Sequence, residues 1–349
     1  MSRLYFYVYP SAFQNPGGGE ILLLKTKQYL EKYGVPVKLF DMWNDKFQQG
    51  DILHVFGSVK EALGLMETAK SKGVKIVHSP IIWYNWQSTL SIAYGFRDRA
   101  LSILRQAAKS FFPQIHSARK KMMRLADAII AGSAMEGDQI HRYFLIPRER
   151  IHTIYYGADP WYAQASPGLF TQKSGLKDFV LMAGRIEPRK NQLHLIRALK
   201  GSGIPLVLAG SAVSWHENYA QQCRAEADAS MHFVGHLQPD SEELRSAFTA
   251  CSVFALPSWF ETPGLAALEA GLAGARLVIT REGSTREYFR EYASYANPGS
   301  ISDIRKKIFA ALEAPKTSGL QNFLKENFTW DLMALKTIRL YETLGLKRA

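Results

Sequence analysis

The chain of 349 residues is too long for one small core and has the right length for two domains. Its composition, 47% apolar and 21% charged, predicts a buried core and excludes wholesale disorder. Lys and Arg number 43 against 31 Asp and Glu, and the net charge of +12 favours nucleic acid, anionic lipid or phosphorylated small molecules as partners.

Strand-like and helix-like patterns alternate through the first half of the chain. A short aromatic run starts at Leu4, and a helical stripe over 20–33 ends at Gly34. Short connections between alternating strands and helices are typical of a parallel sheet with helices on both faces. We expect strands at 4–9, 35–41, 52–56, 74–78, 126–133 and 150–157, and a further helix over 59–72.

The alternation restarts after a polar stretch, 163–175. We therefore expect two α/β domains, each with a doubly wound parallel sheet, over 1–165 and 166–328. Ligands of open parallel sheets bind beyond the carboxyl ends of the strands, which directs the search for a site to those ends. The expected strands of the second domain are 179–184, 206–210, 232–235, 253–258 and 277–280.

The cysteines and the chain start point to a cytoplasmic protein. Cys223 and Cys251 cannot build a disulfide framework, and neither belongs to a C-x-x-C or a Cys/His cluster. No apolar run approaches the roughly 18–20 residues that span a bilayer. The first residues show no signal peptide, so we expect an uncleaved chain.

The segment 253–274, VFALPSWFETPGLAALEAGLAG, is the most informative. A buried strand is followed by a loop and a helix that we expect to start near Pro263, with Thr262 as N-cap. The N–H groups of Gly264 and Leu265 would then lie at a positive helix terminus, which suits a phosphate or a polarised hydroxyl.

Two carboxylates in the same segment, Glu261 and Glu269, are separated as E-x7-E. Glu269 has apolar neighbours on both sides, so its carboxylate needs donors, and the hydroxyls of a ribose would supply two. A charge on a solvent-exposed face is the ordinary alternative for Glu269. The strand–loop–helix context favours the binding role.

A second segment, FVLMAGRIEPRKNQLHLIRAL over 179–199, places cations after a strand. The strand runs into Gly184 and Arg185, and Lys190 follows before a helix. Arg185 and Lys190 could bracket a diphosphate. Basic residues are common in such loops, so solvent charge or ordinary ion pairing stays open for Arg189 and Arg197.

Two features of the first domain are weaker candidates. The glycine run 17–19 offers N–H groups to an anion at a strand-to-helix turn, although many tight turns look the same. His78 ends a strand on its carboxyl side, where a catalytic role competes with a structural one.

The combination of GRIEPRKN, E-x7-E and GGGE resembles the retaining glycosyltransferases of family 4, which have the GT-B fold, over nearly the whole chain. Further matches are ADAIIAGS, IYYGAD, HFVGHL, REGSTREY and NFTWDLMALKTIRLYETL. The resemblance implies two Rossmann-like domains that face a central cleft. It also implies that a C-terminal helix within 329–349 crosses back to the first domain.

The resemblance also implies roles for individual residues. Arg185 and Lys190, after Gly184, would bind the diphosphate of a UDP- or GDP-linked sugar, and Glu269 would hold its ribose. Glu261 and the backbone from Pro263 through Gly264 to Leu265 would hold the transferred sugar and the phosphates. The turn from Val234 to Leu237 would face the base. In the first domain, Gly18 and Gly19 would lie near the phosphates, and His78 would lie near the transferred sugar.

The implied reaction transfers a sugar to a hydroxyl acceptor with retention, the donor's own phosphate taking the proton. The chain contains no D-x-D, so no metal bridge is indicated, and no cofactor is expected. The chain departs from the family pattern at three places. Asn191 stands where glycine is frequent, LAGSAVSW over 208–215 lacks a second glycine, and His78 is followed by Ser79 and Pro80 instead of an acidic residue.

Residues 97–124 contain eight Lys or Arg and one acid, with aromatic residues interleaved. This pattern suits an anionic membrane surface and a lipid-linked or cell-envelope acceptor, with the protein peripheral on the inner face of the membrane. A solvated helix with buried aromatics is the alternative.

Two other functions remain open. A nucleotide-sugar epimerase or hydrolase would share the architecture and consume donor without an acceptor. A non-enzymatic nucleic-acid-binding protein is supported by charge alone, because no RNP-like pattern or recognition helix occurs, so nucleic acid is not expected as a partner.

Overall fold

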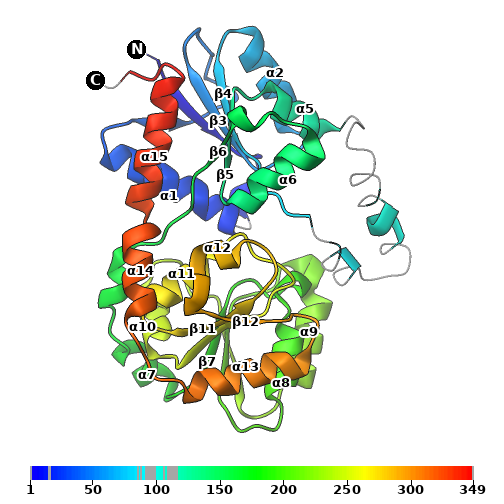
Figure 1. The fold of residues 1–349 in the computed structure, drawn as a ribbon, viewed down its shortest axis with the longest axis vertical. Coiled ribbons are helices and arrows are strands. Elements are labelled where there is room, and N and C mark those ends of the chain that lie inside the picture. The colour runs from blue at the N-terminus through cyan, green and yellow to red at the C-terminus, as the bar shows by residue number, and fades with distance from the viewer. Residues whose placement is uncertain are drawn as a thin grey trace. The chain divides into compact units, whose positions relative to one another are not determined.

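The computed structural model describes residues 2–14, 17–84, 86, 89–90, 100–104, 107 and 117–347. The chain divides into two compact units (Figure 1). Apart from Gln87–Tyr94, it passes from the first unit to the second at Gly157–Ala158 and returns at Thr329–Trp330. The first unit comprises Met1–Trp86, Gly95–Gly157 and Trp330–Ala349, and the second comprises Gln87–Tyr94 and Ala158–Thr329.

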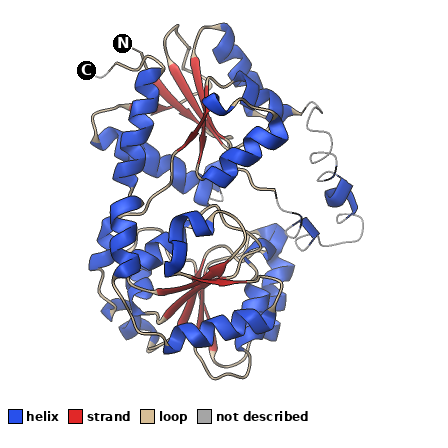
Figure 2. Cartoon of the chain, in the orientation of Figure 1, coloured by secondary structure: helices blue, strands red, loops and turns tan. Residues whose placement is uncertain are grey.

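The first unit is built on a six-stranded parallel sheet in the order β2-β1-β3-β4-β5-β6. Every residue of β1, β3 and β5 is buried, because helices cover both faces of the sheet (Figure 2). The strands are β1 (Leu4–Tyr7), β2 (Val37–Leu39), β3 (Ile52–Phe56), β4 (Lys75–Ser79), β5 (Ala128–Ala131) and β6 (Ile151–Thr153).

Two described helices of the first unit begin at residues that satisfy their free N–H groups. Ser117 accepts from the N–H of Lys120 and Ser133 from that of Glu136, each as an N-cap. The helices are α1 (Gly18–Lys32), α2 (Ala62–Ser71), α5 (Ala118–Leu125), α6 (Ala134–Phe144) and α15 (Trp330–Thr343).

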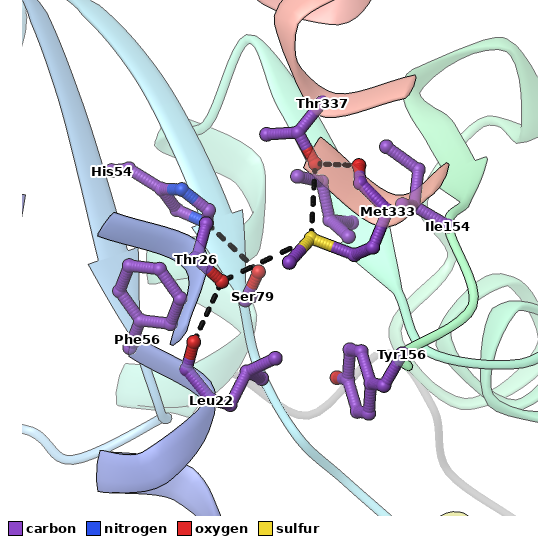
Figure 3. Close-up of a pocket in the computed structure, with 10 residues that line it drawn as sticks. Leu22, Thr26, His54, Phe56, Ser79, Ile154, Tyr156, Met333 and Thr337 are labelled. Atoms are coloured by element: carbon purple, nitrogen blue, oxygen red, sulfur yellow. Dashed lines mark hydrogen bonds between the residues drawn. The ribbon is translucent and has the colours of Figure 1, made fainter. Parts of the chain in front are cut away.

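Helix α15 belongs to the first unit although it ends the chain. Asp331 accepts from Lys32 Nζ at 2.5 Å and from Tyr33 Oη at 2.7 Å, and Tyr341 Oη lies 2.6 Å from His54 Nδ1. Figure 3 shows Met333 beside Thr337 and Thr26 in a small, mainly apolar pocket between α1, α15 and the sheet. These contacts explain why the last helix packs on the first unit.

The second unit has its own six-stranded parallel sheet in the order β12-β11-β10-β7-β8-β9. Five of its strands lie where the sequence predicts them. The sixth, β12, was not predicted, because Ser294 and Tyr295 give it no continuous apolar run. The strands are β7 (Val180–Ala183), β8 (Leu206–Ala209), β9 (Met231–Gly235), β10 (Val253–Leu256), β11 (Arg276–Thr280) and β12 (Ser294–Ala296).

Helices again lie on both faces of this sheet (Figure 2). Ser241 and Ser300 cap α10 and α13 through the N–H groups of Leu244 and Asp303. The helices are α7 (Gly168–Ser174), α8 (Gln192–Leu199), α9 (Glu217–Glu226), α10 (Glu242–Ala250), α11 (Leu265–Leu272), α12 (Thr285–Phe289), α13 (Ile301–Glu313) and α14 (Gly319–Asn327), and the 3₁₀ turns include η3 (Pro160–Gln164) and η4 (Pro188–Lys190).

The expected fold class is therefore confirmed: two parallel sheets, each covered by helices on both faces. No helix in the described part of the chain is both long and apolar enough to cross a membrane.

Candidate active site

Two loops of the second unit meet beyond the carboxyl ends of the neighbouring strands β7 and β10. Lys190, at the end of η4, donates from Nζ to Glu261 Oε1 at 2.7 Å. The N–H of Trp259 donates to the carbonyl of Arg189 at 2.9 Å, so the two loops are also joined through their backbones. The structure thus brings together two residues that lie 71 positions apart in the sequence.

Further charges surround this ion pair. Arg189 Nη1 lies 3.5 Å from Glu261 Oε1, and Arg189 Nη2 lies 2.9 Å from Glu187 Oε1. Arg185 Nε lies 3.7 Å from Glu187 Oε2. The sequence does not predict the ion-pair partners of Arg189, and it does not indicate that Glu187 belongs to the site. Residue spacing alone cannot show which charges meet across two loops.

Burial sets the electrostatics of the Lys190–Glu261 pair. The side chains are only 14% and 5% exposed. Desolvation lowers the pKa of Lys190, and the charge of Glu261 opposes it only in part. Burial alone would raise the pKa of Glu261, but Lys190 and Arg189 outweigh it and hold the pKa below its usual value. The carboxylate is therefore ionised at neutral pH.

The backbone of Glu261 is held by a segment that was not predicted to belong to the site. Ser284 N–H donates to the carbonyl of Glu261 at 3.0 Å, and Glu261 N–H donates to the carbonyl of Glu282. Gly283 between them has φ +98°, and a Cβ there would lie 2.1 Å from the carbonyl oxygen of Glu261. Only glycine allows the two backbones to come this close. The glycine within REGST was the one sequence feature that could have indicated this contact.

Helix α11 starts two residues later than expected. The N-cap is Gly264, with φ +89°, and the preceding Thr262–Pro263 peptide is cis. The prediction that the helix starts near Pro263 with Thr262 as N-cap is therefore wrong. A Cβ on Gly264 would lie 3.5 Å from Glu261 Oε2, so the backbone at this helix start adjoins the carboxylate.

Glu269 lies on α11, half-buried, next to Tyr162 of η3. Burial raises the pKa of Tyr162, and the charge of Glu269 raises it further. The Tyr162 hydroxyl donates to Asp240 Oδ1 at 3.2 Å, which links the chain near Glu269 to the loop that follows β9. Neither Tyr162 nor Asp240 was predicted, because neither belongs to a motif that indicates binding.

The remaining predicted residues of the second unit also lie at carboxyl strand ends. Val234 is in β9 and Leu237 follows it, both half-buried, and the N–H of Gly210 donates to the carbonyl of Gly235 at 2.7 Å. Gly184 follows β7 with its α-carbon facing Lys190, since a Cβ there would lie 3.7 Å from Lys190 Cε.

Asn191 explains one departure from the family pattern. It has φ +64°, in the left-handed region that glycine adopts freely and that asparagine tolerates. Its buried amide donates to the carbonyls of Pro257 and Pro298 at 3.0 and 2.9 Å. Asparagine thus keeps the backbone conformation and adds two hydrogen bonds that glycine could not make.

The three predicted residues of the first unit lie at two places. Gly18 and Gly19 are the first residues of α1, and Glu20 accepts from the N–H of Gly17 at 2.8 Å. A Cβ on Gly18 would meet no atom within 4 Å, so the backbone there is approachable. His78 lies within β4, fully buried, with Nε2 2.8 Å from the carbonyl of Gly57.

The buried His78 predicts an acid-sensitive fold. Nε2 faces a carbonyl and must carry the proton, and burial lowers the pKa of His78 to about 4. Unfolding restores a pKa near 6.5, so the unfolded state binds more protons below that pH and stability falls as the pH drops. We expect the free energy of unfolding, measured in urea, to fall by about 2 kcal/mol from pH 7 to pH 5 through this group.

His78→Gln is the control for this loss, because it removes the titrating group while keeping a side chain that can donate. Between pH 7 and pH 5, the free energy of unfolding of this variant should fall by about 2 kcal/mol less than that of the unmodified protein. Equal pH dependence in His78→Gln and the unmodified protein would contradict the assignment.

Two family profiles match consecutive parts of the chain. Glycosyltransferase Family 4 matches residues 16–162, and Glycosyl transferases group 1 matches residues 170–327. The O-antigen chain mannosyltransferase B of Escherichia coli is 26% identical over 63% of this chain and 61% of its own. Glycogen synthase of Mycobacterium tuberculosis is 26% identical over 65% of this chain and 57% of its own. The matched region thus spans about three fifths of the length of these relatives.

Solved structures of the same fold cover nearly the whole chain. Anabaena HepE in complex with UDP-glucose superposes with a TM-score of 0.72 at 18% identity, covering 98% of this chain and all of its own. Sucrose-phosphate synthase from Thermosynechococcus elongatus gives a TM-score of 0.77 at 16% identity, covering 99% of both chains. The fold is GT-B, and the chain belongs to the glycosyltransferases of group 1 and family 4.

Proposed function

We propose that the protein is a retaining glycosyltransferase that moves a sugar from a nucleoside-diphosphate sugar to a hydroxyl acceptor. The observation that carries the proposal is the buried Lys190–Glu261 pair, which lies beside Arg189 and the glycine-capped start of α11. Similar folds bind UDP and UDP-glucose, and curated relatives are named as sugar transferases. Both facts support a nucleotide-sugar donor.

In this proposal Arg185 and Lys190 stabilise the charge that grows on the leaving diphosphate as the glycosidic bond breaks. Such fixed charge is usually the largest catalytic contribution. The backbone at Gly264 and Leu265 adds a positive helix terminus next to Glu261. The cations of the chain take the place of a metal ion at the diphosphate.

Glu261 and Glu269 have different tasks. Glu261 is committed to Lys190 and Arg189, which suits a carboxylate that orients a cation and accepts from sugar hydroxyls. Glu269 accepts from the ribose. Proton transfer from the acceptor to the donor's phosphate gives retention without an enzymic nucleophile. The contacts that the family resemblance implies for Gly18, Gly19 and His78 stay predictions.

The acceptor is proposed to be a polysaccharide, glycolipid or cell-envelope glycan, held at an anionic membrane surface. Half of residues 97–124 lie outside the described residues, so this part rests on the basic sequence and on α5. There Lys121 and Arg124 are exposed, and Lys121 Nζ is ion-paired with Glu67 Oε1. The cationic head of Arg124 suits anionic headgroups.

The experiment is a thermal-shift panel of UDP, GDP, ADP and their sugars, followed by transfer assays with the stabilising donor. A ligand at 100 times its dissociation constant should add about 2.7 kcal/mol of stability. The product should retain the anomeric configuration by NMR, and EDTA should leave the rate unchanged. Donor consumption without an acceptor would favour the epimerase or hydrolase alternative, and absence of stabilisation by every nucleotide would defeat the proposal.

A further inference from the structure

Charges of alternating sign line up along the site of the second unit. The ion-pair distances are 2.7 Å from Lys190 to Glu261, 3.5 Å from Glu261 to Arg189, 2.9 Å from Arg189 to Glu187 and 3.7 Å from Glu187 to Arg185. We call these five residues the charge chain. A cation stands at each end, and these two cations are the ones expected to bind the diphosphate.

The middle cation, Arg189, is fixed more firmly than a surface arginine. Its Nη1 donates to the carbonyl of Phe260 at 3.3 Å, and its guanidinium lies over the Phe260 ring, 5.3 Å from the centroid. Its Nε donates to Glu187 Oε1 at 3.0 Å. Arg189 thus reaches both carboxylates while it packs on Phe260.

Glu261 needs more than one cation because it is nearly inaccessible to water. With Arg189 in place, its negative charge is shared, and Lys190 is not fully neutralised. The charge chain then carries three positive and two negative charges, a net +1 available to an anion. Without Arg189 the four remaining charges sum to zero. Lys190 is then paired with Glu261 alone, and Arg185 with Glu187 alone.

We propose that Glu187 and Arg189 are positioning residues: they hold the charge chain in a geometry in which Lys190 and Arg185 remain free to bind one diphosphate. The inference rests on the proposed function for the identity of that diphosphate. Neither residue touches the reacting atoms. Their effect acts through the end cations.

The test is calorimetric binding of inorganic pyrophosphate, UDP, GDP and ADP to the full chain. Arg189→Met should weaken binding about tenfold, and Arg189→Lys should restore most of it. A pH series adds a second readout. Lys190 faces Glu261, Glu187 and Arg189, and Arg189 lowers its pKa, so Arg189→Met should shift the alkaline loss of binding to higher pH.

Two variants separate positioning from loss of charge. Arg197→Met removes one arginine from α8, where it is paired with Glu226 at 2.6 Å, and should leave binding unchanged. Glu187→Gln removes one negative charge, so charge alone predicts tighter binding, whereas loss of positioning predicts weaker binding. Thermal unfolding at pH 7 verifies that each variant is folded.

The outcomes are distinct. Arg189→Met that binds pyrophosphate like Arg197→Met, or Glu187→Gln that binds it more tightly, overturns the inference. An unmodified protein that binds pyrophosphate but none of UDP, GDP and ADP overturns the proposed function and leaves the charge chain as an anion site. An unmodified protein that binds neither pyrophosphate nor any of these nucleotides overturns both.

Discussion

Lys190→Ala should lower kcat/KM for sugar transfer by about 10²–10³-fold, the usual cost of removing one preorganised group that stabilises transition-state charge. The loss should appear in kcat as well as KM, since the charge on the leaving diphosphate grows in the transition state. Steady-state kinetics with the donor identified by thermal shift provide the measurement. Turnover within a few-fold of the unmodified protein would remove Lys190 from the site.

A matched control for this variant exists in the same unit. Lys173 donates to Glu243 Oε2 at 2.8 Å, nearly the geometry of Lys190 with Glu261, but its side chain is 57% exposed. Lys173→Ala should leave transfer unchanged and cost little stability. Lys190→Ala should also lower the melting temperature, because it leaves the buried Glu261 with fewer cations.

Gly283→Ala should be strongly destabilising, although it adds only one methyl group. The Cβ would lie 2.1 Å from the carbonyl oxygen and 2.8 Å from the nitrogen of Glu261, and φ at this position is +98°. We expect a loss of about 3 kcal/mol or more in the free energy of unfolding. Displacement of Glu261 should reduce transfer about 10²-fold even where the variant folds.

Gly274→Ala separates backbone strain from collision. Gly274 has φ +88°, and a Cβ there would meet no atom within 4 Å. This variant should cost only about 1–2 kcal/mol and leave transfer intact. Urea unfolding and steady-state kinetics on Gly283→Ala and Gly274→Ala provide the measurement. Equal losses of stability in the two variants would show that collision with Glu261 does not cause the destabilisation.

The architecture was predictable because the central strands are continuous apolar runs. Strands such as β5 and β10 are buried on both faces, and their short apolar runs are bounded by polar or turn-forming residues. Strand β12 was not predicted, because it is only three residues long and contains the polar residues Ser294 and Tyr295. Its place is set by pairing with β11, a contact that no local pattern reveals.

The site was predictable only where chemistry and local structure coincide. Lys190 and Glu261 follow strands closely, and topology brings their loops together. The start of α11 was misplaced because the preference of proline for a first helical turn pointed to Pro263, while the positive φ of Gly264 delays the helix. The role of Arg189 could not be predicted, because its partners are fixed by packing on Phe260.

The paired backbones at Ala158 and Thr329 have a consequence for the order in which the chain can fold. Ala158 N–H donates to the carbonyl of Phe328 at 3.0 Å, so the chain leaves and re-enters the first unit through adjacent segments. Residues 158–329 of the second unit are thus an insertion whose two ends lie side by side. The first unit is incomplete until α15 has been synthesised. Only then can α15 pack on the sheet of the first unit, where Tyr341 contacts His54.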